Sequence, residues 1–332
     1  MSVLARNLAR MNDTPAIGIC FDRTFPASEV SDYAQRAEAA GLQELWLIED
    51  CFFTTAPPLA AAALASTRSL RVGLGIVPAV VRTAALTAME IATLASMAPG
   101  RVIGGIGHGV QPWMAQMGVR PASPVTALDE VLTAVRRLLA GETLDLTGEY
   151  VTARSVRLEH RPDIVPPVVA GVRGPKSLAV AGRSADGVLL DSPCPIDYLL
   201  QATSICGRAG DGFDYRCFAM LCVLPDRQQA RRAVAPVLAE MVRHGHAGLV
   251  ALPFHDDLKE LTGRYGADWA DQAPNDWWTR IGAIGNLEDA FEYVGAMTDA
   301  GASGISFFPA DDLEIAYAQL ETAGSIARAL PR

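Results

Sequence analysis

A glycine-rich segment interrupted by one histidine is the most distinctive chemical feature of the sequence. Residues 104–109 read GGIGHG and close an apolar run that is typical of a buried strand. Glycines at a strand end let a ligand approach the backbone and expose amide groups to it. The spacing differs from that of a dinucleotide-binding loop, because Val110 stands where the last glycine should be. We therefore expect a ligand near His108, while a tight turn with only a packing role stays open.

The segment 170–177, AGVRGPKS, has the composition of an anion-binding helix start. Its two glycines free the backbone, and Lys176 and Ser177 fall in the first turn of the next helix, where amide groups point outward. It is not a Walker A loop, in which the glycines are spaced further apart. We favour anion binding. Two alternatives stay open: Pro175 simply starts a helix at its preferred position, or Lys176 forms a Schiff base in a lyase.

Two adjacent carboxylates, Glu49 and Asp50, follow the apolar run 44–48. Neighbouring residues on a strand point to opposite faces, so at most one of them faces a cavity, and we favour Asp50 for acid–base work. The next residue, Cys51, has no histidine near it in the sequence and is a weak candidate for a thiol nucleophile.

Metal binding is not predicted. His244 and His246 lie at a helix end with no carboxylate at usable ligand spacing, and we interpret both as solvated surface. The six cysteines contain no CxxC pair, so zinc and iron–sulfur spacing is missing. In a chain of this length they are typical of free thiols in a reducing cytosol.

Composition narrows the class of protein further. The chain has 332 residues, half of them hydrophobic, with 28 basic and 37 acidic residues and a net charge of -9. A sizeable core is assured, and without a clustered basic face we expect no nucleic-acid partner. The start of the chain, 1–15, lacks the apolar stretch of a secretory signal, and no apolar run approaches the length that spans a bilayer. We expect a soluble, cytoplasmic protein without a membrane partner.

The elements that must position these residues alternate regularly along the chain. Apolar runs typical of strands covered on both faces lie at 16–20, 44–48, 70–77, 101–106, 167–170, 187–190, 216–224 and 304–308. Helical periodicity is present at 28–40, 59–66, 84–97, 127–139, 176–182, 227–243 and 313–328. This pattern predicts an α/β fold, a (β/α)8 TIM barrel in which the chemistry lies at the carboxyl ends of the strands.

The surplus over a bare barrel predicts two insertions in a single domain that covers 1–332. One, after strand 4 at 141–158, has the pattern of a hairpin with its turn near Gly148. The other, after strand 7 at 245–285, carries Trp269, Trp277 and Trp278, and we expect it to lie over one end of the barrel.

Several motifs together resemble the luciferase-like flavin and deazaflavin oxidoreductase superfamily. They are LWLIED at 45–50, VGLGIV at 72–77, PGRVIGGIGHG at 99–109, and AGVRGPKS at 170–177 with ADG at 185–187. More closely, the sequence is similar to the branch that uses the deazaflavin coenzyme F420, such as methylenetetrahydromethanopterin reductase. The resemblance runs from about residue 16 to residue 329 and implies a barrel with the cofactor across its carboxyl face.

The resemblance also implies cofactor-binding positions. Asp50 would approach the deazaflavin ring or its ribityl hydroxyls, and a bulge at Gly75 and Ile76, often with a cis peptide bond, would back the ring. The other implied positions are Gly107, His108 and Gly109 beside the ring and ribityl chain, and Ala170, Gly171, Val172 and Gly174 around the phosphate, with Lys176 and Ser177 nearby.

The sequence departs from the glucose-6-phosphate dehydrogenases of this branch. Cys51, Thr55 and Val110 stand where those enzymes have histidine, tryptophan and glutamate, so sugar phosphate oxidation is not expected. The expected substrate pocket is apolar, which favours a hydrophobic or planar substrate. Its predicted residues are Phe52, Phe53, Val110, Trp113, Phe307 and Phe308.

The function predicted from these features is an F420-dependent oxidoreductase. It would transfer a hydride between the deazaflavin and a small hydrophobic or imine- or enone-type substrate, with Asp50 orienting the cofactor and His108 donating a proton. An FMN-dependent monooxygenase of the same superfamily and a non-catalytic cofactor-binding barrel stay open. The resemblance implies a homodimer.

Overall fold

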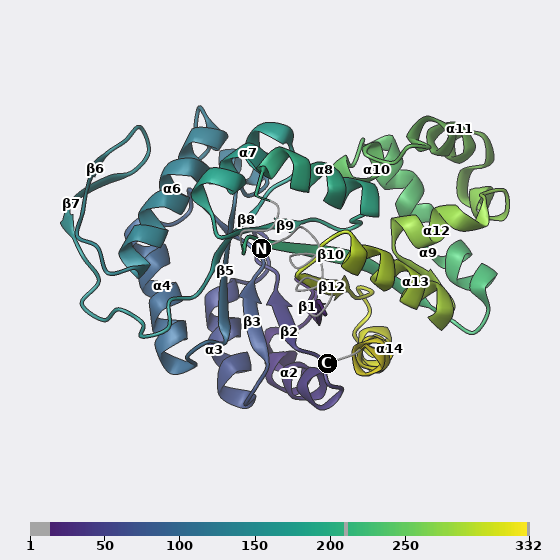
Figure 1. Cartoon of the computed structure of the whole chain (residues 1–332), viewed down its shortest axis with the longest axis horizontal. Helices are drawn as coiled ribbons and strands as arrows, with labels where there is room; N and C mark the ends of the chain where they lie inside the picture. The colour runs from purple at the N-terminus through teal and green to yellow at the C-terminus, as the bar shows by residue number, and fades with distance from the viewer. Residues whose placement is uncertain (1–13, 209–211, 331–332) are drawn as a thin grey trace, which may run out of the picture.

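Eight parallel strands form a closed barrel in the computed structural model, which describes residues 14–208 and 212–330 (Figure 1). Their order around the barrel is β1-β2-β3-β5-β8-β9-β10-β12, and β12 pairs with β1 to close it. The strands are β1 (Ala16–Phe21), β2 (Glu44–Leu47), β3 (Arg71–Leu74), β5 (Val102–Gly107), β8 (Val168–Gly171), β9 (Gly187–Leu190), β10 (Asp214–Val223) and β12 (Gly304–Phe308). The predicted TIM barrel is confirmed.

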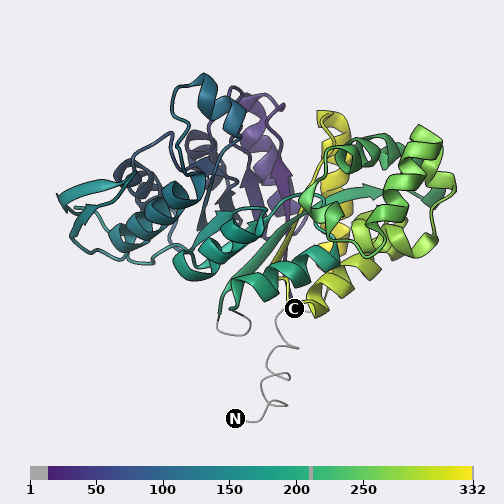
Figure 2. The ribbon, with the colours of Figure 1, turned by 90° about the horizontal axis from the view of Figure 1, so that it is seen from above.

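Helices surround the barrel and cover the outer faces of its strands (Figures 1 and 2). They are α2 (Val30–Ala39), α3 (Ala56–Ser66), α4 (Ala84–Met97), α6 (Pro124–Leu139), α7 (Pro175–Ser184), α8 (Ile196–Cys206), α9 (Arg227–Arg243), α13 (Leu287–Asp299) and α14 (Leu313–Ala329). The main core lies between strands and helices, because strands covered on both sides are apolar on both faces. No helix in residues 14–208 and 212–330 has the length and apolar character needed to cross a bilayer.

Several elements differ from the sequence-based expectation, among them helix α13, which lies in a stretch without a predicted element. The predicted strand 70–77 is split into β3 and the short β4 (Val77–Pro78), which pairs with β5. Helix α8 was not predicted, although Tyr198, Leu199 and Ala202 form a buried face at helical spacing. A short helix, α5 (Gln111–Gln116), follows the glycine-rich segment directly.

The first insertion is the predicted hairpin. Strands β6 (Leu144–Thr147) and β7 (Thr152–Val156) pair antiparallel, and Gly148 lies in the turn between them. The carboxylate of Glu130 on α6 accepts hydrogen bonds from the amides of residues 149–151, which fixes this turn on the barrel.

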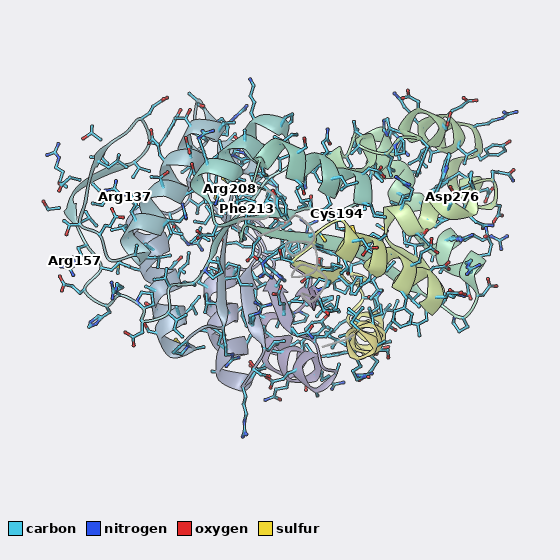
Figure 3. All side chains as sticks on the ribbon, in the orientation of Figure 1. Arg137, Arg157, Cys194, Arg208, Phe213 and Asp276 are labelled. Atoms are coloured by element: carbon cyan, nitrogen blue, oxygen red, sulfur yellow. The ribbon has the colours of Figure 1, made fainter. Side chains whose placement is uncertain are left out.

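The second insertion packs beside the barrel around α9 instead of lying across a barrel end (Figure 2). It contains α10 (Ala247–Val250), α11 (His255–Tyr265), a 3-10 helix (Gly266–Asp271), α12 (Asn275–Ile281) and β11 (Ala283–Gly285), which pairs with the carboxyl end of β10. Trp269 and Trp278 stack at 4.7 Å in a core of their own. The insertions mark opposite ends of the molecule, with Arg157 on one side and Asp276 on the other (Figure 3).

Candidate active site

A cavity of about 520 Å³ opens at the carboxyl ends of the barrel strands. The structure brings many of the predicted site residues together in its wall, although they come from widely separated parts of the sequence. These are Asp50, Gly75, Ile76, His108, Gly109, Val110, Trp113, Gly171, Val172, Gly174, Ser177 and Phe308. The location is the one expected for a barrel enzyme.

Two predicted residues on strands face away from the cavity. Phe307 is fully buried in the core between strands and helices, whereas its neighbour Phe308 lines the cavity and packs edge-on against Phe218 with the ring centres 5.7 Å apart. Ala170 is also fully buried in the outer core. The reason is the alternation of side chains along a strand, which sends one of two neighbours outward.

Three more predicted residues lie outside the cavity wall because they are exposed on loops or a helix. Phe52 and Phe53, on the loop after β2, are 64% and 53% exposed, and the Phe53 ring lies beneath the Arg23 guanidinium. Lys176 is exposed on α7. Gly107 is buried behind the wall, where a Cβ atom would come within 2.6 Å of the Gly171 carbonyl oxygen.

The two adjacent carboxylates after β2 are turned to different partners. Glu49 is buried, binds Arg82 through both oxygens at 2.6 and 3.0 Å, and accepts the Ala56 amide at the start of α3. Asp50 forms an ion pair with Arg23, and both residues line the cavity. Burial raises the pKa of Asp50 in spite of the Arg23 charge. Glu49 also borders the cavity, but its oxygens are taken by Arg82 and the Ala56 amide, so Asp50 is the more available of the two carboxylates.

The expected bulge at Gly75 and Ile76 is present. The peptide bond between them is cis, and the two residues lie in the cavity wall between β3 and β4. Glycine is required opposite Ile76, because a Cβ atom on Gly171 would come within 2.4 Å of the Ile76 side chain. A flat ring could therefore rest against an aliphatic surface at this bulge.

His108 is hydrogen-bonded at both ring nitrogens. Its Nδ1 lies 3.1 Å from the Pro124 carbonyl oxygen, and its Nε2 lies 2.8 Å from Ser177 Oγ. Because a carbonyl oxygen can only accept, Nδ1 carries the proton, and in the neutral ring Nε2 accepts the Ser177 hydroxyl. Burial lowers the pKa of His108 against the effect of the Pro124 bond, which favours this neutral form. The predicted role as a proton donor to substrate is not favoured by this geometry.

The start of α7 fits an anionic group. Its first turn faces the cavity through Gly174 and Ser177, Gly174 stands at the cap position without a capping side chain, and a Cβ atom there would meet open space. Uncapped amides at a helix start carry a partial positive charge and bind phosphate. Arg173, which precedes this turn, also lines the cavity and forms an ion pair with Asp191. These residues fit the phosphate of a flavin or deazaflavin.

A pair formed by an aspartate and a histidine, which was not predicted from the sequence, lies across the cavity from Asp50. Asp191, directly after β9, lines the cavity and forms an ion pair with Arg173. The interpretation of His246 as solvated is wrong, since its side chain is only 10% exposed and lies beside Asp191, whereas that of His244 is 73% exposed. The one sequence signal for this pair was the position of Asp191, a polar residue directly after the predicted strand 187–190. In the described ranges, no group of three or more His, Cys, Asp or Glu side chains could hold a metal ion.

Comparisons with known proteins agree with this geometry. Residues 1–304 match the luciferase-like monooxygenase family. The chain is 29% identical over 235 residues to 5,10-methylenetetrahydromethanopterin reductase of Methanolobus tindarius, covering 68% of this chain and 71% of that protein. It is 26% identical over 304 residues to the reductase of that name from Archaeoglobus fulgidus, covering 86% and 91%.

A solved structure shares the fold. It is an F420-dependent secondary alcohol dehydrogenase in complex with an F420-acetone adduct, with a TM-score of 0.74 at 17% identity, covering 96% of this chain and all of the other. The expected resemblance is confirmed by the family match, which spans most of the chain. The chain belongs to the luciferase-like monooxygenase family.

Proposed function

We propose that this protein is a coenzyme F420-dependent oxidoreductase that acts on a small hydrophobic organic substrate of the imine or enone type. One observation carries the proposal: a single cavity contains the Gly75–Ile76 bulge, Asp50 and an uncapped helix start at Gly174. The names of relatives support F420 rather than FMN, since two of them are an F420-dependent hydroxymycolic acid dehydrogenase and an F420-dependent glucose-6-phosphate dehydrogenase. A bound deazaflavin would supply hydride chemistry.

The residues of the chain would then hold the phosphate of the cofactor, orient its ring and enclose the reacting groups. The amides of the first turn of α7 would bind the phosphate, and Ile76 would support the ring from behind. Asp50, held by Arg23, would fix a polar edge of the cofactor. His108 would keep Ser177 in place through the 2.8 Å hydrogen bond rather than reach the substrate.

The rest of the wall suits an apolar substrate. Phe308, Phe218, Trp113 and Val110 line the cavity and would exclude water from the reacting groups. The exposed Phe52 is placed on the loop outside this wall. The substrate would therefore be recognised mainly through apolar and aromatic contacts.

The test is a fluorescence titration of the purified protein with oxidised F420 and, separately, with FMN. We expect tight binding of F420 and weak binding of FMN. Preference for FMN together with oxygen uptake driven by reduced flavin would instead indicate a monooxygenase. Binding of neither cofactor would contradict the proposal and leave the glycine-rich segments with a structural role.

We also propose a cytoplasmic homodimer. All six cysteines lie in the described residues as free thiols, which suits a reducing compartment. The outer face of α4 exposes Leu86, Met89 and Met97, with 45%, 54% and 55% of each residue accessible, and this apolar stripe would be covered in a dimer. Light scattering coupled to size-exclusion chromatography tests the dimer, and the double variant Met89→Glu, Met97→Glu should yield monomer.

A further inference from the structure

Asp191 is a cavity carboxylate that has so far no role in cofactor binding. It stands directly after β9 with a side chain that is 29% exposed toward the cavity. Its Oδ1 accepts the Ser192 amide at 2.8 Å, and its Oδ2 faces the Arg173 guanidinium. The carboxylate is thus held in one orientation while keeping access to a ligand.

His246 lies behind this carboxylate with its protonation pattern set by the backbone. The Gly248 amide donates to His246 Nδ1 at 3.2 Å, and since an amide can only donate, the proton of the neutral ring is on Nε2. Nε2 is buried, has no partner at hydrogen-bond distance among the described residues, and lies 3.6 Å from Asp191 Oδ2. An N–H that faces a carboxylate and nothing else can tune the affinity of that carboxylate for a proton.

Asp50 and Asp191 lie on opposite sides of the barrel mouth. Strands β2 and β9 are separated by three strands in either direction around the closed order, so their carboxyl ends face each other. Burial raises the pKa of Asp50. Burial also acts to raise the pKa of Asp191, but His246 and Arg173 outweigh it and the pKa of Asp191 is lowered. Environments that separate two carboxylates in this way are typical of sites with distinct acid–base roles.

We propose that Asp191 is a catalytic base and acid of this site, that His246 is its positioning residue, and that the substrate carries an O–H or N–H on the reacting carbon. The inference rests on the proposed function. In the oxidative direction, an Asp191 carboxylate oxygen would accept the O–H or N–H proton as the substrate C–H bond breaks, and a bound oxidised deazaflavin would supply the acceptor for the hydride and its two electrons. The carbon–heteroatom double bond forms, so the substrate class is a secondary alcohol or amine and the matching ketone or imine.

The first experiment needs no turnover. Histidine ring resonances are compared by NMR at one pH in wild-type protein and in the variants Asp191→Asn and His244→Gln. We expect the His246 ring resonances to shift in Asp191→Asn, because the carboxylate that faces Nε2 is lost, and to stay in place in His244→Gln. Unchanged His246 resonances in Asp191→Asn would overturn the pairing.

The second experiment uses the protein loaded with F420 and the probes isopropanol, cyclohexanol, pyrrolidine and piperidine, with loss of oxidised deazaflavin absorbance as the readout. Asp191→Asn should lower kcat by about 100-fold or more while KM and F420 affinity stay within about twofold. His246→Gln, which retains Asp191, should move the acid limb of kcat to higher pH, because the base then loses its proton only at higher pH. His244→Gln should match wild type.

The acid limb of kcat also depends on the other titratable and charged groups that act on Asp191. They are Arg173 after β8, Asp50 after β2, Cys20 of β1, Cys194 after β9 and Tyr198 of α8. Retained kcat in Asp191→Asn would overturn the proposal. The proposal would also be overturned if the protein bound F420 and turned over cyclohexenone but none of the four probes. Binding of F420 with turnover of no compound at all would overturn it as well. Failure of F420 to bind would instead remove the proposed function.

Discussion

Ser177 Oγ lies 2.8 Å from His108 Nε2, so a residue of α7 is joined to the glycine-rich segment at the carboxyl end of β5. The other ring nitrogen holds the Pro124 carbonyl oxygen at the start of α6. One imidazole therefore ties three separate segments together at the cavity wall. In the neutral form that burial favours, this arrangement fixes a single tautomer, and protonation would place a charge on a buried ring, which makes the site sensitive to pH.

This sensitivity should be visible in stability. Burial lowers the pKa of His108 in the fold, so at mildly acidic pH the unfolded chain binds more protons than the folded one, and the free energy of unfolding falls as pH falls. In His108→Asn this loss should be smaller between about pH 7.5 and about pH 5. Urea unfolding at both pH values measures the difference, with exposed His244→Gln as the control. Equal pH dependence in wild type and His108→Asn would contradict the neutral ring.

Removal of the Ser177 hydroxyl should weaken the binding of the cofactor through its phosphate. In Ser177→Ala we expect the affinity for F420 to fall about tenfold, which corresponds to about 1.4 kcal/mol, because His108 Nε2 loses its donor and no longer holds the first turn of α7 in place for the phosphate. A deazaflavin without the phosphate should bind as it does to wild type. Fluorescence titrations with both compounds test this, and Ser325→Ala on α14 is the control. An equal loss for both compounds would place the phosphate elsewhere.

Glu49 should matter for stability rather than for binding. Its carboxylate is buried, paired with Arg82 and bonded to the Ala56 amide. Glu49→Gln leaves Arg82 with Glu90 as its remaining charge partner and should lower the free energy of unfolding by about 2 kcal/mol. The exposed pair of Asp32 and Arg36 provides the control, since Asp32→Asn should cost about 0.5 kcal/mol or less. Urea unfolding measures both, and F420 affinity of folded Glu49→Gln should stay unchanged.

The neighbours Phe307 and Phe308 should respond in opposite ways. Phe307 is fully buried in the outer core, so Phe307→Ala should lower the free energy of unfolding by about 3–5 kcal/mol. Phe308 faces the cavity, so Phe308→Ala should cost less stability and weaken ligand binding more. Chemical unfolding and F420 titration of both variants separate these effects. Strong loss of binding in folded Phe307→Ala with none in Phe308→Ala would reverse the assignment of faces.

Most of the barrel could be predicted from the sequence because the signals for its strands and helices are local. Apolar runs and helical periodicity lie within single segments, and the helix predicted over 84–97 and that over 227–243 have the bounds of α4 and α9. Helix α8 was missed since it has no charged face apart from Asp197. The cis bond at Gly75 was expected from family resemblance rather than from any local pattern.

The site was only partly predictable, and the missing part is long-range. Glycines and a histidine after a strand indicated a ligand site by themselves, since strand ends meet at one face of a barrel. Only the tertiary structure decided that both nitrogens of His108 are engaged and that Phe307 faces away. It also placed His246 beside Asp191, 55 positions earlier in the chain. Such contacts depend on how distant segments pack, and no local pattern in one sequence encodes that proximity.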